Sequence, residues 1–211
     1  MATDQRRPAP RDRVCKTSRA RYLLSADQVL KMVAAGIIRE GEGVELWDGV
    51  LYVMTKGETH NFIVGQAGDL IRPLLPDGFH LREEKSARRG EWSLPEPDLG
   101  VCRGARGDFW PDLPTLEHFV MLVEVNHHSE TADRIDKLAA YAEAGVPVYW
   151  VVDVADRSVA VYTDPARPDQ TRGRYATLRT ARAGETVDVV VDGETRGSVS
   201  VDDLFPLGPK G

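Results

Sequence analysis

The feature that most constrains the fold is the segment Phe119–Val125, in which Glu124 alone interrupts six apolar residues. An apolar run of this kind predicts a strand that is buried on both faces, as in the middle of a sheet covered by helices. The run is much too short to cross a bilayer, which takes about 20 residues. It therefore favours a mixed β-sheet with helices packed against it, in an α/β or α+β fold.

The flanking sequence predicts helices and further strands. Ser25 and Gln28 form a capping-box pattern that begins a helix, and Gly36 ends it. Asp48-Gly49 favours a type I′ turn between two strands. Two more helices are expected at about 59–72 and 132–144. Further strands are expected at 44–47, 50–54, within 79–103 (the second at 98–102), at 119–125, 148–152, 159–162, and near 175–178, 187–191 and 199–201.

The length and composition suit one domain with short tails. The chain has 211 residues, of which 42% are hydrophobic and 28% charged, and this excludes a disordered chain. We expect a basic arm over residues 1–21, a single domain over 22–205 and a tail over 206–211. Within the domain, a core spans about 22–163 and a β-rich extension spans 174–205.

Charge is spread unevenly along the chain. The net charge is −6, but residues 1–22 carry seven basic and two acidic side chains, a local charge of +5. Such an arm could help to hold a polyanion, or it could be a solvated tail without a partner. The acidic remainder lowers the expectation of tight DNA binding without a metal.

Cysteine usage and the lack of targeting segments indicate a reducing compartment. Cys15 and Cys102 are the two cysteines, and their spacing matches no metal site. No secretory signal follows the N-terminal arginines, and no apolar run is long enough for a membrane span. We therefore expect a cytoplasmic protein without a membrane partner.

Three carboxylates stand in apolar surroundings: Glu45 in Val-Glu-Leu-Trp, Asp98 before Leu-Gly-Val-Cys, and Glu124. An ionised carboxylate in such a strand is costly unless a positive group lies opposite, and Mg²⁺ is an obvious candidate. Each residue also has a purely structural explanation. Glu45 could pair with an arginine at a sheet edge, Asp98 could begin a strand, and Glu124 could form a buried salt bridge.

The third predicted helix carries a lysine thirteen residues after Glu124. Apolar residues mark the expected buried side of this helix: Ile135, Leu138, Ala139 and Ala142. Lys137 and Tyr141 lie together on a different face, where a lysine is usually solvated and a tyrosine usually packs. The carboxylates just upstream make Lys137 a candidate site residue, and Tyr141 could orient it. His60 could contact the site or simply be a polar residue at a helix start.

These segments, in this order, resemble one known family. Glu45 in VELWDGVLYVM, His60, Asp98 in PEPDLGV, Glu124 in FVMLVEV and Lys137 in DKLAAYAEAGVPVYWVVD are similar to the Uma-type endonuclease family. This is a bacterial group of domains of unknown function within the PD-(D/E)XK nuclease superfamily. The resemblance covers about residues 22–163.

The resemblance implies a restriction-endonuclease-like fold, a mixed sheet flanked by helices. It further implies that Asp98, Glu124 and Glu45 bind Mg²⁺, for which Mn²⁺ could substitute, and that Lys137 acts beside the attacking water. The activity would be endonucleolytic hydrolysis of DNA that leaves a 5′-phosphate, and pairing into a homodimer would allow both strands to be cut.

The sequence departs from the superfamily at one point. The lysine normally stands two residues after the second acid, where this chain has Asn126, followed by His127-His128. In the Uma-type family the lysine's role falls to the next helix, hence Lys137. The departure keeps a rival function open, namely a nuclease-fold module that binds nucleic acid or a protein without cutting. Hydrolysis of a small phosphoester is a third alternative.

Overall fold

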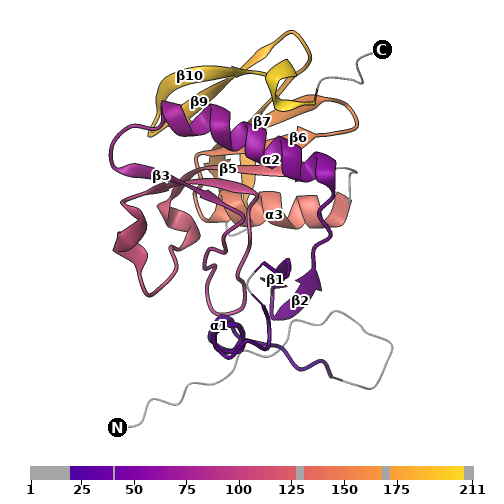
Figure 1. The fold of residues 1–211 in the computed structure, drawn as a ribbon, viewed down its shortest axis with the longest axis vertical. Coiled ribbons are helices and arrows are strands. Elements are labelled where there is room, and N and C mark those ends of the chain that lie inside the picture. Colours follow the sequence, from indigo (N-terminus) through magenta and orange to yellow (C-terminus); the bar gives the residue numbers. More distant parts are fainter. Residues whose placement is uncertain (1–19, 40, 127–130, 168–171, 207–211) are drawn as a thin grey trace.

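A computed structural model describes residues 20–39, 41–126, 131–167 and 172–206 of the chain. Figure 1 shows a central sheet with the long helix α2 (Glu58–Ile71) along it and a second helix, α3 (Thr131–Glu143), behind. The strands of the central sheet lie in the order β3-β4-β5-β6-β7-β8. Their bounds are β3 Phe79–Glu83, β4 Leu99–Arg103, β5 Phe119–Asn126, β6 Val148–Asp153, β7 Ser158–Ala166 and β8 Arg174–Ala181.

Neighbouring strands of this sheet pair antiparallel except β5 and β6, which are parallel. A parallel pair needs a crossover connection, and α3 forms part of it. The mixed sheet expected from the sequence is thus confirmed. β5 is buried along almost its whole length, as its apolar run predicts.

The two faces of β5 and β6 pack against different layers. On one face, Val123, Val125 and Trp150 join a core cluster that includes Ile63 and Ala67 of α2. On the other face lie Leu122, Tyr149 and Val151, in the cluster that includes Tyr141 of α3. Glu124, two residues after Leu122, therefore points toward α3 and away from α2.

The N-terminal part of the described chain forms a small unit beside the sheet (Figure 1). It contains α1 (Ala26–Ala34), β1 (Val44–Trp47) and β2 (Val50–Val53). Ser25 and Gln28 form the expected capping box. Asp48 and Gly49 both have positive φ, 46° and 84°, as the type I′ turn requires.

A second hairpin covers the outer side of α2. It consists of β9 (Thr186–Val191) and β10 (Glu194–Ser200), followed by a 3₁₀ turn at Asp202–Leu204. Val187, Val189 and Val199 are buried in the same core cluster as the α2 residues. Helix α2 therefore lies between this hairpin and the sheet, as Figure 1 shows.

None of the helices within the described ranges is both long and apolar enough to cross a membrane. The expected arm over residues 1–21 and tail over 206–211 fall almost entirely outside the described residues. The His127-His128 pair also lies outside them. The division into arm, domain and tail stays a prediction.

Candidate active site

A buried ion-pair network joins β5 to α3. The Lys137 ammonium lies 3.3 Å from both carboxylate oxygens of Glu124, and the Tyr141 hydroxyl donates to Glu124 Oε1 at 2.8 Å. Lys137 and Tyr141 are four residues apart and so share one face of the helix. Glu124 and Lys137 are each about 95% buried, and Tyr141 is fully buried. All three side chains are therefore held away from bulk water.

Glu45 reaches the same lysine from the N-terminal hairpin. Its Oε2 lies 3.4 Å from Lys137 Nζ, and its Oε1 accepts a hydrogen bond from the backbone N–H of Glu96 at 3.2 Å. Glu45 is 3% exposed, although it belongs to a two-stranded sheet outside the main one. Lys137 thus links β1 to β5 through two carboxylates.

Asp98, immediately before β4, lies next to this ion-pair network. Its Oδ2 accepts the backbone N–H of Val125 at 2.8 Å, which ties it to the residue after Glu124. Its Oδ1 lies 3.1 Å from His60 Nε2 and 3.8 Å from Lys56 Nζ. The antiparallel pairing of β4 with β5 accounts for this position, because Leu99 lies opposite Val123.

The structure also brings together residues that the sequence analysis did not select. Lys56 Nζ lies 3.1 Å from Glu84 and 3.3 Å from Glu96. Ligand atoms of His60, Glu84 and Asp98 lie within 4.8 Å of one another, close enough to share a metal ion. Lys56 and Glu84 lie in polar connecting segments. The sequence contains no sign of either, because a charged residue stands out only among apolar neighbours.

Electrostatics in this cluster favour an additional cation. Burial raises the pKa of Glu124 to about 8; Lys137 opposes the shift, while the charges of Asp98 and Glu45 add to it. Burial lowers the pKa of His60, but the hydrogen bond and charge of Asp98 outweigh burial and raise it overall. For Lys56, burial again lowers the pKa, and Asp98 and Glu84 outweigh it.

The charge balance of the cluster leads to the same conclusion. Its five carboxylates face two lysines and one histidine, namely Glu45, Glu84, Glu96, Asp98 and Glu124 with Lys56, Lys137 and His60. With the histidine protonated and all five carboxylates ionised, an excess of two negative charges remains, which one divalent cation would offset. The proton that Glu124 holds near neutral pH reduces this excess to one until a metal ion displaces it. The carboxylates suit Mg²⁺ and Mn²⁺ among the common metals, whereas an imidazole ligand is more typical of transition metals.

Five of the six side chains expected at the site lie in this cluster, and the sixth, Tyr141, donates to Glu124, but one expectation about α3 is wrong. Periodicity placed Ile135 on the buried side of the helix and Lys137 on a different face. In the structure Ile135 is 48% exposed and Lys137 is 4% exposed. The reason is that Glu124 and Glu45 provide Lys137 with buried partners, which a hydrophobicity pattern cannot register.

Comparisons with known proteins identify a family and a similar fold. Residues 26–193 match the model of a family, Uma2, that is described as "Putative restriction endonuclease". The fold is similar to the crystal structure of a putative nuclease of the DUF820 group from Anabaena variabilis, with a TM-score of 0.62 and 16% sequence identity. That likeness covers 86% of this chain and 97% of the other. No curated protein matches the chain.

Proposed function

This chain belongs to the Uma2 family of putative restriction endonucleases, and on that premise we propose that it hydrolyses phosphodiester bonds of DNA with the help of a divalent metal ion. One observation carries the proposal. Glu45 and Glu124, from separate segments of the chain, both contact the buried ammonium group of Lys137. Asp98 is hydrogen-bonded to the residue that follows Glu124. Acidic side chains can hold the metal ion that assists hydrolysis of a phosphodiester, and a nearby lysine can stabilise the charge that develops on the phosphate.

In this proposal Asp98, Glu124 and Glu45 hold Mg²⁺, for which Mn²⁺ can substitute. Glu84 and His60 stand close enough to Asp98 to complete the ligand set. A metal ion at these carboxylates would neutralise charge on the phosphoryl oxygens and lower the pKa of water. The cluster's excess negative charge and the raised pKa of Glu124 support this assignment.

Lys137 is the group that we assign to the reacting phosphate. Its ammonium has three donors, and contacts with Glu45 and Glu124 hold it in place. From there it would donate to the attacking water or to the charge that develops on phosphate, as a preorganised electrostatic contribution. Tyr141 acts through Glu124 and is a positioning residue.

The test combines metal binding with plasmid nicking on one set of samples. Wild type is compared with Asp98→Asn, Glu124→Gln and, as a matched control, Asp69→Asn on the exposed side of α2. We expect Mg²⁺ or Mn²⁺ binding in wild type and the control, measured by calorimetry. Binding should weaken at least tenfold in both site variants, and nicking should be lost with it.

Two results would contradict this function. A wild type that binds no metal would make the carboxylates structural and favour the non-cutting binding module. Metal binding without nicking of any DNA form would exclude DNA cleavage by the isolated chain. Hydrolysis of bis(p-nitrophenyl) phosphate by a protein that leaves plasmid intact would instead indicate that the substrate is a small phosphoester.

If both strands of a duplex are cut in one binding event, a homodimer would supply a site for each strand. Sedimentation velocity with and without a DNA duplex tests this part of the proposal separately. A monomer in both conditions would contradict it without affecting single-strand nicking.

A further inference from the structure

A cationic hollow of about 470 Å³ lies at the outer edge of the central sheet. It is lined by four strongly basic side chains and a histidine, namely Arg72, Arg82, Lys85, Arg106 and His80. Glu83 is the carboxylate of this lining, and it is ion-paired with Arg72. The hollow therefore carries a net positive charge on a chain whose overall charge is −6.

Backbone carbonyls hold two of the guanidinium groups. Arg82 donates to the carbonyl of Ser86 at 3.2 Å, and Arg106 donates to that of Leu81 at 3.3 Å. Within the described ranges, no carboxylate lies at ion-pair distance from either group. Burial and the neighbouring charge of Arg106 lower the pKa of Arg82, so the like charges repel each other. Fixed, uncompensated guanidinium groups of this kind suit an anionic ligand.

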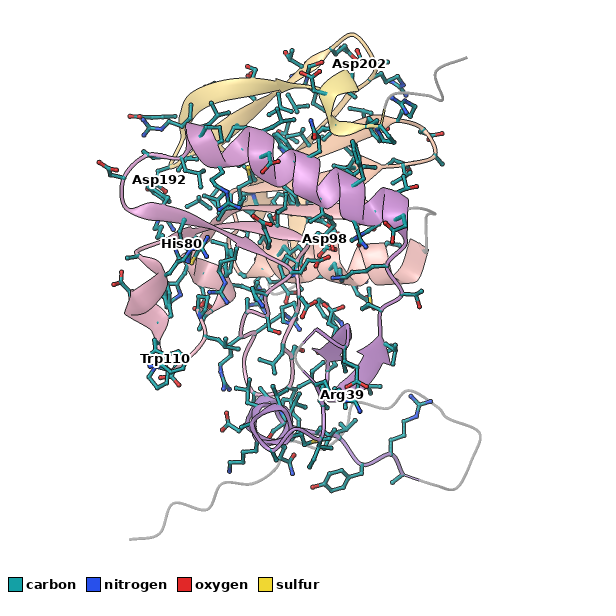
Figure 2. The ribbon with its side chains drawn as sticks, viewed as in Figure 1. Arg39, His80, Asp98, Trp110, Asp192 and Asp202 are labelled. Carbon is teal, nitrogen blue, oxygen red and sulfur yellow. The ribbon has the colours of Figure 1, made fainter. Side chains whose placement is uncertain are left out.

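The hollow and the candidate active site are connected along the chain through β3. Residues 80–83 of β3 line the hollow. The next residue, Glu84, donates its backbone N–H to the carbonyl of Asp98 at 2.9 Å. Figure 2 shows His80 and Asp98 spaced apart along this part of the sheet. The four residue steps from His80 to Glu84, of which the last leaves β3, span at most about 13 Å at roughly 3.3 Å each. That length matches the axial rise of about four nucleotides of one DNA strand.

We propose that this hollow binds successive phosphates of the DNA strand whose scissile phosphate lies at Asp98. The inference rests on the proposed function and adds to it the path of the substrate. Contacts with phosphate position the strand and do not depend on its sequence. Arg82 and Arg106 would each donate to a phosphate, while Lys85 is the contact nearest the site.

The test measures DNA binding and not cleavage. A fluorescein-labelled DNA duplex is titrated with the full chain in EDTA at several salt concentrations, and anisotropy gives Kd. The variant is Lys85→Gln with Arg106→Gln. The matched control is Lys31→Gln with Arg179→Gln, because Arg179 likewise donates to a backbone carbonyl, that of Thr186, and lies away from the hollow.

We expect the hollow variant to weaken Kd by about tenfold or more and to reduce the slope of log K against log salt by about two. The control should keep the wild-type Kd and slope within twofold. Lys85→Gln alone, at an exposed position, should reduce the slope by about one and tests the proposal if the double variant fails to fold.

The outcomes separate this inference from the proposed function. If wild type nicks plasmid and the hollow variant keeps the wild-type Kd and slope, the hollow does not bind DNA and the inference fails alone. Calorimetry with pyrophosphate gives a second test. If wild type binds pyrophosphate, the hollow variant does not, and the two bind DNA equally well, then the hollow binds a free phosphate compound and the inference is again overturned. A wild type that neither nicks DNA nor binds the duplex overturns both.

Discussion

Glu124 is the residue on which most of the site's electrostatics depend. It is a carboxylate within the most buried strand of the sheet, and its pKa of about 8 reflects burial against the partial compensation by Lys137. Near neutral pH, the metal-free protein therefore holds a proton at Glu124 that a metal ligand must release. Metal binding and proton release are coupled at this side chain.

The first prediction follows from that coupling. A carboxylate whose pKa is raised is mostly protonated below that pKa, so Mg²⁺ affinity should fall about tenfold per pH unit below about pH 8 and level off above it. Calorimetry in buffers of different ionisation enthalpy measures both affinity and proton release. Asp69→Asn should behave as wild type. A pH-independent affinity between about pH 6 and 8 would exclude Glu124 as a ligand.

The second prediction concerns Tyr141. Its hydroxyl donates to ionised Glu124 and so favours the charged form. Tyr141→Phe should therefore raise the pKa of Glu124 and move the midpoint of the metal-binding pH profile upward. Tyr175→Phe is the matched control, because it loses a hydroxyl that donates to the carbonyl of Val146, with no expected shift. An unchanged midpoint in Tyr141→Phe would leave Tyr141 a packing residue.

At this scale the sequence predicts carboxylates better than their partners. Glu45, Asp98 and Glu124 stand out because polar atoms are conspicuous in apolar strands. Lys137 follows from the family resemblance, since helical periodicity alone gave it a solvated position. Neither the apolar pattern nor the family resemblance predicts Glu84 and Lys56, because only the tertiary fold brings their connecting segments beside Asp98.

Among the elements, β4 shows how closely the sheet layers are packed. A Cβ atom at Gly100 would meet ring atoms of Phe119 at 2.5 Å and 2.7 Å and Leu122 at 3.1 Å. Glycine is therefore required by the close approach of β5 side chains. No local propensity reveals this, because glycine is otherwise unfavourable in a strand.

The third prediction compares two glycine substitutions. Gly100→Ala should lower the free energy of unfolding by about 2–3 kcal/mol, because overpacking forces the ring of Phe119 to move. Gly65→Ala, in the middle of α2 with nothing near its Cβ position, should raise it by about 0.5–1 kcal/mol. Urea denaturation measures both. Equal effects of the two substitutions would contradict the packing of β4 against β5.

Element boundaries were predictable where capping or turn chemistry is local. The start of α1 at its capping box and the Asp48-Gly49 turn are confirmed by the structure. β7 and β8 are longer than expected, reaching Ala166 and Ala181, because each pairs with the other along the sheet. The length of a strand depends on which strand pairs with it, and a single sequence does not reveal that pairing.

At the scale of the whole molecule, the C-terminal hairpin forms part of the main core. Val187, Val189, Val191 and Val199 are buried against the core that also contains α2 residues. The family match ends at residue 193, between β9 and β10, although β10 contributes to the same core. The C-terminal segment is therefore part of the core and not an appendage.

The fourth prediction tests this role. Deleting residues 184–211 should expose the apolar side of α2, so the truncated chain should bind the dye ANS and lose cooperative thermal unfolding. Ending the chain at residue 206 instead is the control, since it keeps the hairpin and should unfold as the full chain does. A truncated chain that unfolds cooperatively without ANS binding would contradict the description of the core.

The parallel pairing of β5 with β6 also bears on the order in which the protein folds. Glu124 and Lys137 lie on β5 and on the connecting helix, only 13 residues apart, so their ion pair closes a short loop. The ion pair of Lys137 with Glu45 closes on the order of 90 residues, at a higher entropic cost. Docking of the N-terminal hairpin should therefore follow assembly of the β5-α3-β6 unit. Charge neutralisation at Lys137 would be completed only in that late step.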